Sequence, residues 1–213
     1  MQLINNVLKL VFFGAVIMST ACSNLNYSAT TQILKRYDLH LPQSLEKKLD
    51  PNGPSLLIYP VQSNNLSNST RIAYSLKKFE VSYYSQNVWI DTPAHLLTPL
   101  VISNMENSNL FGAVVRSGSS AITDLALYTE LLTLIHEYED DKSKILLSMR
   151  MQLIDLRKRN VIASETLNIE EVAISNDPYG AVVATNAAVN KLMPLMQKFV
   201  SQSIKPESIS LTP

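Results

Sequence analysis

Alternation of apolar and polar residues predicts β-strands along much of the chain. The clearest case is residues 145–153, where isoleucine, leucine and methionine alternate with Ser148, Arg150 and Gln152, as in a half-buried strand. Residues 125–138 begin with the same alternation but become apolar on both faces around 131–135. By the same reasoning, we predict further strands at residues 36–41, 55–61, 71–74, 79–84 and 161–169.

The turns between these strands indicate how they pair. Residues 75–78 would close a hairpin between 71–74 and 79–84, and residues 158–160 would join the strands at 145–153 and 161–169. Residues 42–54 form a connector with Asn52-Gly53 as a turn, and the polar run 63–70 is typical of a solvated loop.

Two helices are predicted by their start signals and apolar spacing. Asp91-Thr92-Pro93 supplies a capping oxygen and a proline for the first helical position, so the first helix should cover about 94–107, with Pro99 inside it. Its inner face would hold Leu97, Leu100 or Val101, and Met105. Asp177 and Pro178 begin a second helix, which Pro194 should bend. The apolar stripe of this helix, at spacings of three and four, is Ala181, Ala184, Ala188, Leu192, Leu195 and Phe199.

The order strands, helix, meander, helix predicts the fold class. We expect one α+β domain with a mixed or antiparallel sheet and two main helices packed on one face. This domain should cover residues 35–204, followed by a loose tail at 205–213.

The N-terminus has the layout of an export signal. Lys9 is the only charged side chain before an apolar run at 10–18, and the small residues Ser19, Thr20 and Ala21 precede Cys22. The run is shorter than the ~20 residues that a membrane span needs. Residues 1–21 are therefore predicted to be a signal peptide.

Cys22 is the only cysteine, so the chain forms no internal disulfide. Its position resembles a lipobox, in which the thiol takes a diacylglyceryl group and the freed amine a further acyl chain such as palmitate, although Ser19 stands where lipoboxes usually have Leu, Val or Ile. The alternative is an ordinary signal peptide followed by a free thiol, which would be a liability in an oxidising compartment. Several acyl chains make a durable anchor. We therefore expect residues 22–34 to be a lipidated tether, and Ser23, in place of Asp, favours the outer membrane.

Composition excludes some functions. Lysine and arginine together number 18, as do aspartate and glutamate, so the chain lacks the basic footprint of a nucleic-acid-binding protein. Five glycines leave little material for phosphate-binding loops, and no serine lies in a Gly-x-Ser-x-Gly motif.

Titratable residues give no catalytic or metal pattern. His40, His95 and His136 have no ligand-like spacing and are predicted to be surface or capping residues, so we expect no metal and no cofactor apart from the lipid on Cys22. The acidic cluster at residues 137–141 (Glu137, Glu139, Asp140 and Asp141) is predicted to be a solvated hairpin turn. We therefore expect that the protein is not an enzyme.

The aromatic residues Tyr74, Tyr83, Tyr84 and Trp89 are candidates for a partner interface, because tyrosine and tryptophan often anchor interfaces. Tyr83 and Tyr84 are adjacent and would face opposite sides of a strand. The alternative is packing in the core and at the sheet edge.

Several segments in order resemble a known family, the ABC-type transport auxiliary lipoproteins (PqiC-like membrane integrity lipoproteins). The resemblance covers roughly residues 36–200. The matching segments are Tyr37-Asp38-Leu39, Leu57 to Val61, Arg71 to Tyr74 with the aromatic residues up to Trp89, Asn109 to Val114, and the alanine-rich helix at 181–188.

The resemblance implies a docking role beside a lipid-transport system of the mammalian-cell-entry (MCE) type. In such systems an inner-membrane ABC transporter works with a periplasmic tunnel protein, and the lipoprotein lies on the periplasmic face of the outer membrane. We therefore expect an MCE-domain partner, a lipid anchor in the membrane and a possible homo-oligomer. The alternative is another envelope scaffold, such as an assembly factor for lipopolysaccharide or outer-membrane proteins.

Overall fold

The computed structural model describes residues 33–40, 48–64 and 67–204. The predictions for the signal peptide, Cys22, most of the tether and the tail at 205–213 lie outside the described residues. The described chain has two helices and a mixed sheet of nine strands, so the expected single α+β domain is confirmed.

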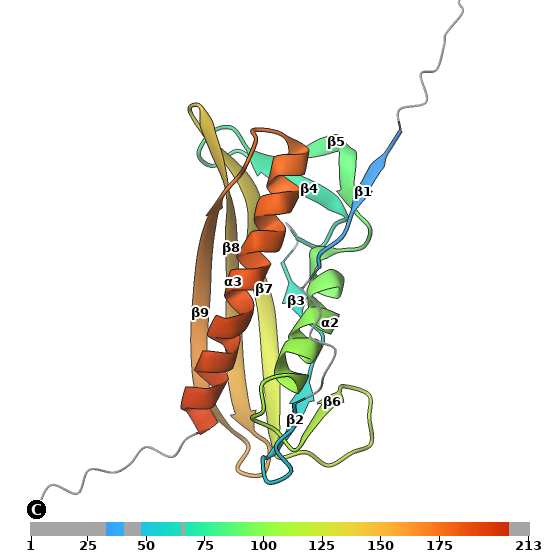
Figure 1. Cartoon of the computed structure of the whole chain (residues 1–213), viewed down its shortest axis with the longest axis vertical. Helices are drawn as coiled ribbons and strands as arrows, with labels where there is room; N and C mark the ends of the chain where they lie inside the picture. Colours follow the sequence, from blue (N-terminus) through green and yellow to red (C-terminus); the bar gives the residue numbers. More distant parts are fainter. Residues whose placement is uncertain (1–32, 41–47, 65–66, 205–213) are drawn as a thin grey trace, which may run out of the picture. The chain divides into compact units, whose positions relative to one another are not determined.

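Three long antiparallel strands form one half of the sheet (Figure 1). They are β7 (Leu125–Glu139), β8 (Lys142–Asp155) and β9 (Asn160–Val172). β8 pairs with β7 over its whole length and with β9 on its other side. All three were expected from the sequence. β9 pairs only with β8 among the described strands, so it is an edge of the sheet.

The other edge of β7 is covered by three short strands in succession. β2 (Ser55–Ile58) pairs with the start of β7, β3 (Gln62–Ser63) with its middle, and β4 (Arg71–Ser75) with its end, all in parallel. The segment from 55 to 75 therefore acts as one interrupted strand beside β7. The outer strands are β5 (Ser82–Trp89), which pairs with β4 and β1 (Lys35–Tyr37), and β6 (Ala113–Arg116), which pairs with β2.

The predicted hairpin at 71–84 exists, but its second strand begins at Ser82 rather than Phe79. Phe79 lies in the turn with a φ of 71°, a left-handed conformation outside any strand. β1 is also shorter than expected, since it ends at Tyr37, and the Asp38 carboxylate accepts a hydrogen bond from the Leu39 N–H directly after it.

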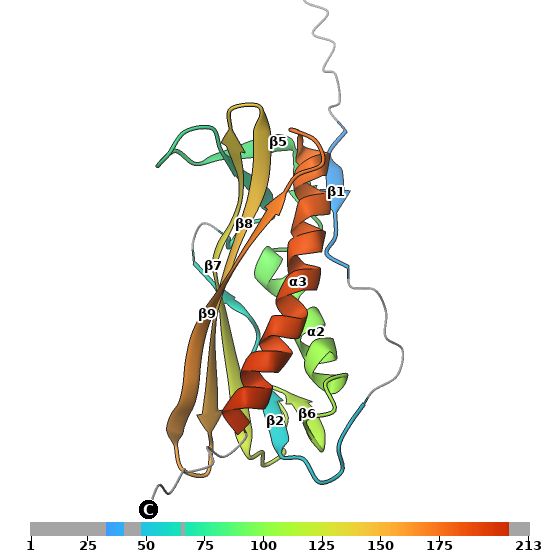
Figure 2. The ribbon, with the colours of Figure 1, turned by 60° about the vertical axis from the view of Figure 1, so that its left-hand side comes forward.

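Two helices, α2 (Pro93–Glu106) and α3 (Pro178–Ile204), lie on the same face of the sheet (Figures 1 and 2). Pro93 opens α2 as predicted, and the Asp177 carboxylate accepts a hydrogen bond from the Gly180 N–H at 2.8 Å to cap α3. Both helices continue past their internal prolines, Pro99 and Pro194.

The core lies between the helices and the sheet. Leu97 of α2, Leu192 of α3, and Leu127 and Met149 of the long strands are fully buried there. One expectation for α3 is wrong, because Leu195 is 38% exposed while Met196 is buried. Leu195 and Met196 follow Leu192 by three and four residues, so their side chains lie on opposite sides of the apolar stripe. In α3 it is Met196 that faces the core.

A β-bulge at Leu132 explains the segment that is apolar on both faces. The register shifts between Leu131 and Thr133, so β7 gains one residue relative to β8. Leu127 and Leu131 point toward the helices before the bulge, and Leu134 and His136 do so after it. Within the described ranges, no helix is long and apolar enough to cross a membrane.

Candidate functional site

Four aromatic side chains meet where β4, β5 and β7 lie side by side. Tyr74 stacks on Tyr84 with ring centroids 4.5 Å apart, and the His136 and Tyr138 rings are also 4.5 Å apart. Residue 74 is the register partner of His136, so the strand pairing brings them together. We call Tyr74, Tyr84, His136 and Tyr138 the tyrosine-histidine cluster.

The Tyr84 hydroxyl is the hub of this cluster. It lies 2.8 Å from His136 Nδ1 and 2.7 Å from the Tyr138 hydroxyl. Tyr138 also lies 3.4 Å from the carbonyl of Asn176, just before α3. With one proton on each hydroxyl, all three contacts are made when His136 Nδ1–H donates to Tyr84, Tyr84 donates to Tyr138, and Tyr138 donates to the Asn176 carbonyl. The hydrogen bonds therefore join β5, β7 and the start of α3.

Burial keeps the cluster neutral. His136 is fully buried, and desolvation lowers its pKa to about 4, against a smaller opposing effect of the Asp177 carboxylate. Burial also raises the pKa of Tyr84, and its hydrogen bond with Tyr138 raises it further. Both groups are uncharged at neutral pH. The cluster is therefore a packed polar network rather than an acid-base pair exposed to a substrate.

The three histidines have different surroundings. His136 is buried, so the prediction of a surface or capping position is wrong for this residue, because the bulge at Leu132 turns it toward the helices. His40 and His95 are exposed as expected, and His95 Nδ1 lies 3.2 Å from Asp91. The described residues contain no group of three potential metal ligands among His, Cys, Asp and Glu.

Of the acidic cluster, Asp140 and Asp141 form the turn between β7 and β8 as predicted, whereas Glu137 and Glu139 belong to the end of β7. Asp140 has a φ of 49° and lies with Asp141 in the exposed turn. Lys144 Nζ lies 2.9 Å from Glu139 and 3.7 Å from Glu137. These are ordinary surface ion pairs, which contribute little to stability.

The predicted aromatic interface residues have different environments. Tyr74, Tyr83 and Tyr84 are all half-buried, but only Tyr74 and Tyr84 pack in the cluster, and Tyr83 has the Arg71 guanidinium 4.2 Å from its ring centroid. Trp89 is only 3% exposed and packs in the core. Trp89 therefore has almost no surface for a partner, which narrows the expected interface to the tyrosines.

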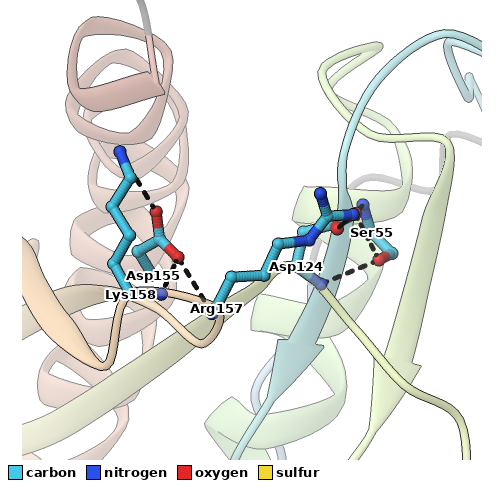
Figure 3. Close-up of polar contacts among 5 residues, drawn as sticks. All are labelled: Ser55, Asp124, Asp155, Arg157 and Lys158. Atoms are coloured by element: carbon cyan, nitrogen blue, oxygen red, sulfur yellow. Dashed lines mark hydrogen bonds and ion pairs between the residues drawn. The ribbon is translucent and has the colours of Figure 1, made fainter.

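A second polar cluster, which the sequence analysis did not identify, ties the opposite end of the sheet together (Figure 3). Asp124 accepts hydrogen bonds from the N–H and the hydroxyl of Ser55 at 2.8 and 2.7 Å, and it pairs with Arg157. The hydrogen bonds from Ser55, the backbone one first, lower the pKa of Asp124. The neighbouring Asp155 accepts from the N–H groups of Arg157 and Lys158 in the β8–β9 turn. These contacts fix the positions of β2, β7 and that turn.

One open cleft lies between α2 and the ends of β2 and β6. It has a volume of about 330 Å³, and Ile58, Pro60, Pro99 and Ile102 give it a mainly apolar wall, with Arg116 at its border. The volume is at the lower end of the range of small-molecule sites. Neither cluster lines this cleft, whose polar lining residues include His95 and Thr98.

Comparison with known proteins identifies the family of this chain. The family described as the ABC-type transport auxiliary lipoprotein component matches residues 37–194. The chain belongs to this family. It is not a family of enzymes, and its members are lipoprotein components associated with an ABC transport system and thereby with a membrane.

Two solved structures have a similar fold. Protein XCC0632 from Xanthomonas campestris aligns with a TM-score of 0.67 at 16% identity, over 80% of this chain and 95% of its own. A second, uncharacterised protein aligns with a TM-score of 0.63 at 12% identity, over 79% of this chain and 99% of its own. At this identity the two structures show the fold alone. The comparison with curated proteins found no match.

Proposed function

We propose that this lipoprotein is anchored by the lipid on Cys22 to the periplasmic face of the outer membrane, where it docks onto an MCE-domain protein of an ABC-type phospholipid transport system. The observation that carries the proposal is the family match over residues 37–194. The lone cysteine directly after Ala21 supports the anchor.

The structure supports binding rather than chemistry as the contribution of this subunit. The buried histidine, His136, is neutral, fully buried and hydrogen-bonded to Tyr84. A group that a substrate cannot reach does not act on one. The polar clusters instead hold strands and turns in place, as a docking domain requires.

Docking onto a ring-shaped tunnel favours a partner that is itself multivalent. Several copies arranged around one axis would turn successive contacts into intramolecular ones. Tyr83 beside Arg71 gives an amphipathic aromatic contact on β5, and the unpaired edge of β9 offers a second surface. We therefore include self-association in the proposal.

The anchor is tested by expressing the full chain and analysing the mature N-terminus by mass spectrometry. We expect a triacylated Cys22 in wild type, retained in Ser19→Leu, which restores the usual lipobox residue. Cys22→Ala should be exported without lipid and leave the membrane fraction. An unmodified Cys22 in the wild-type protein would contradict the anchor, and separation of the two membranes on a sucrose gradient shows which one holds the protein.

A further inference from the structure

The turn between β4 and β5 exposes large apolar side chains. This hairpin tip, residues 76–81, contains Leu76, Phe79 and Val81, which are 56%, 94% and 46% exposed. Phe79 has a φ of 71°, which is unfavourable for a bulky L-residue. The backbone thus holds an aromatic ring out in solvent at an energetic cost, and strain of this kind is concentrated at functional sites.

Lysines stand next to this ring. Lys77 and Lys78 are both exposed, and Lys78 Nζ lies 5.1 Å from the Phe79 ring centroid. An apolar ring with ammonium groups beside it suits the bilayer interface, where the ring enters the acyl region and the ammonium groups meet phosphates. Neither packing in a protein core nor binding of a soluble ligand would require lysines beside the Phe79 ring.

The hairpin tip lies at the same end of the domain as the start of β1. β1 runs parallel to β5, with Lys35 paired to Asn87, so the first residue of β1 faces the side of the tip. Figures 1 and 2 show the start of β1 and the β4–β5 hairpin at the same, upper end. The 13 residues from Cys22 to Leu34 span at most roughly 45 Å at about 3.5 Å per residue. The anchor thus keeps this end close to the bilayer.

Acidic residues at the same end make its charge mixed. Glu80 belongs to the tip, and the neighbouring β7–β8 turn carries Glu139, Asp140 and Asp141, of which Glu139 is paired with Lys144. Electrostatic attraction between the whole end and an anionic membrane is therefore weak. Insertion of the apolar side chains has to provide most of the binding, and the two lysines add local contacts with phosphate.

We propose that the hairpin tip inserts Phe79 into the surface of the phospholipid bilayer that carries the Cys22 anchor. This inference rests on the proposed anchoring of Cys22 for its biological setting. It implies a fixed orientation: the end with the two hairpin turns faces the membrane, and the end with β6 and the β8–β9 turn points away from it, toward the periplasm (Figure 1).

The test uses the full chain carrying Cys22→Ala, so that binding by the tip is measured without acyl chains. Flotation with vesicles of phosphatidylethanolamine and phosphatidylglycerol should show weak but measurable binding. Phe79→Ser should lower the partition coefficient roughly tenfold, in line with the transfer of one aromatic side chain out of an apolar phase. Lys77→Gln with Lys78→Gln should lower it less, and only when phosphatidylglycerol is present.

Ile122→Ser is the matched control, because Ile122 is 99% exposed in the loop before β7, at the far end from the tip. We expect this variant to bind like the parent. In the same background, the emission of Phe79→Trp should shift to the blue on addition of vesicles, whereas that of Ile122→Trp should not. Equal binding of the parent and Phe79→Ser, or equal losses in Phe79→Ser and Ile122→Ser, would overturn the proposal.

These outcomes are separate from those of the proposed function. A failed anchor shows as an unmodified Cys22 in mass spectrometry, whereas a failed insertion shows as vesicle binding that does not depend on Phe79. If Phe79→Ser keeps vesicle binding but loses co-purification of an envelope protein, the tip is a protein contact, and membrane insertion is wrong.

Discussion

At the residue scale, the tyrosine-histidine cluster shows how a buried polar group can be accommodated without function in catalysis. His136 Nδ1 has the Tyr84 hydroxyl at 2.8 Å, and the rings of Tyr74 and Tyr138 pack around the pair. Hydrogen bonds of this kind fix the relative positions of the strands, while the other ring nitrogen, His136 Nε2, is buried without a hydrogen-bond partner among the described residues. The low pKa of His136 makes the stability of the cluster sensitive to acid.

The first prediction concerns stability between pH 7 and pH 4. The pKa of His136 is about 4 in the folded chain, against the usual 6.5, because of burial, and Asp177 is the charged group that opposes the shift. Between these values the unfolded chain binds more protons, so the contribution of His136 to stability is complete above pH 6.5 and decreases as the pH falls toward 4. The loss should be on the order of 1–3 kcal/mol.

Urea denaturation of the full chain at pH 7 and pH 4.5 measures this loss. His136→Phe should show a weaker pH dependence than wild type, since it removes the group that titrates. His95→Phe is the matched control, because His95 is exposed, and it should retain the wild-type dependence. An unchanged pH dependence in His136→Phe would show that the histidine does not become protonated on unfolding.

The environment of His136 could not be predicted from the sequence because it depends on the bulge at Leu132. Simple alternation from Leu125 to Leu131 places the odd positions inward, and by that rule His136 would point away from the helices. One additional residue in β7 reverses the rule from Leu134 onward. The run that is apolar on both faces at 131–135 was the available signal of such a change of register.

At the element scale, long periodic segments were predictable, and short ones were not. β7, β8, β9 and both helices agree with their sequence patterns, because each buries one continuous face. β3 has only two residues and exists because it fills the edge of β7 between β2 and β4. The cluster of Ser55, Asp124 and Arg157 was also missed, since its members are separated in sequence and meet only after the strands pair.

The second prediction uses the two leucines of α3 that the sequence pattern did not distinguish. Leu192 is fully buried against the sheet and Leu195 is 38% exposed. Leu192→Ala should lower the free energy of unfolding by about 2–5 kcal/mol, because it leaves a cavity in the core. Leu195→Ala should change it by no more than about 1 kcal/mol. Urea denaturation compares the two, and equal effects would contradict the packing of α3 described above.

At the scale of the whole molecule, the two ends of the sheet differ in what they expose. One end has the hairpin tip with Phe79 and the acidic β7–β8 turn, and the other has the network of Ser55, Asp124 and Arg157. The open edge of β9 and the ring of Tyr83 are the surfaces that the proposed self-association would use. The difference between the two ends of the sheet suits a docking subunit attached to a membrane.

The third prediction is that the full chain carrying Cys22→Ala forms a homo-oligomer, alone or with its MCE-domain partner. Near-zero net charge imposes little repulsion between copies. Light scattering gives the mass in both conditions. We expect Tyr83→Ala to weaken the assembly and Ile122→Ala to leave it intact. A strict monomer with and without the partner would exclude the ring.

The central claim is that this lipoprotein docks onto an MCE-domain protein, and co-purification tests it most directly. The wild-type chain, tagged after Pro213, is cross-linked in intact cells, solubilised in detergent and purified, and its partners are identified by mass spectrometry. The account predicts an MCE-domain tunnel protein as the main partner, reduced when Cys22→Ala removes the chain from the membrane. Recovery of a lipopolysaccharide or outer-membrane protein assembly complex, with no MCE-domain protein, would contradict it.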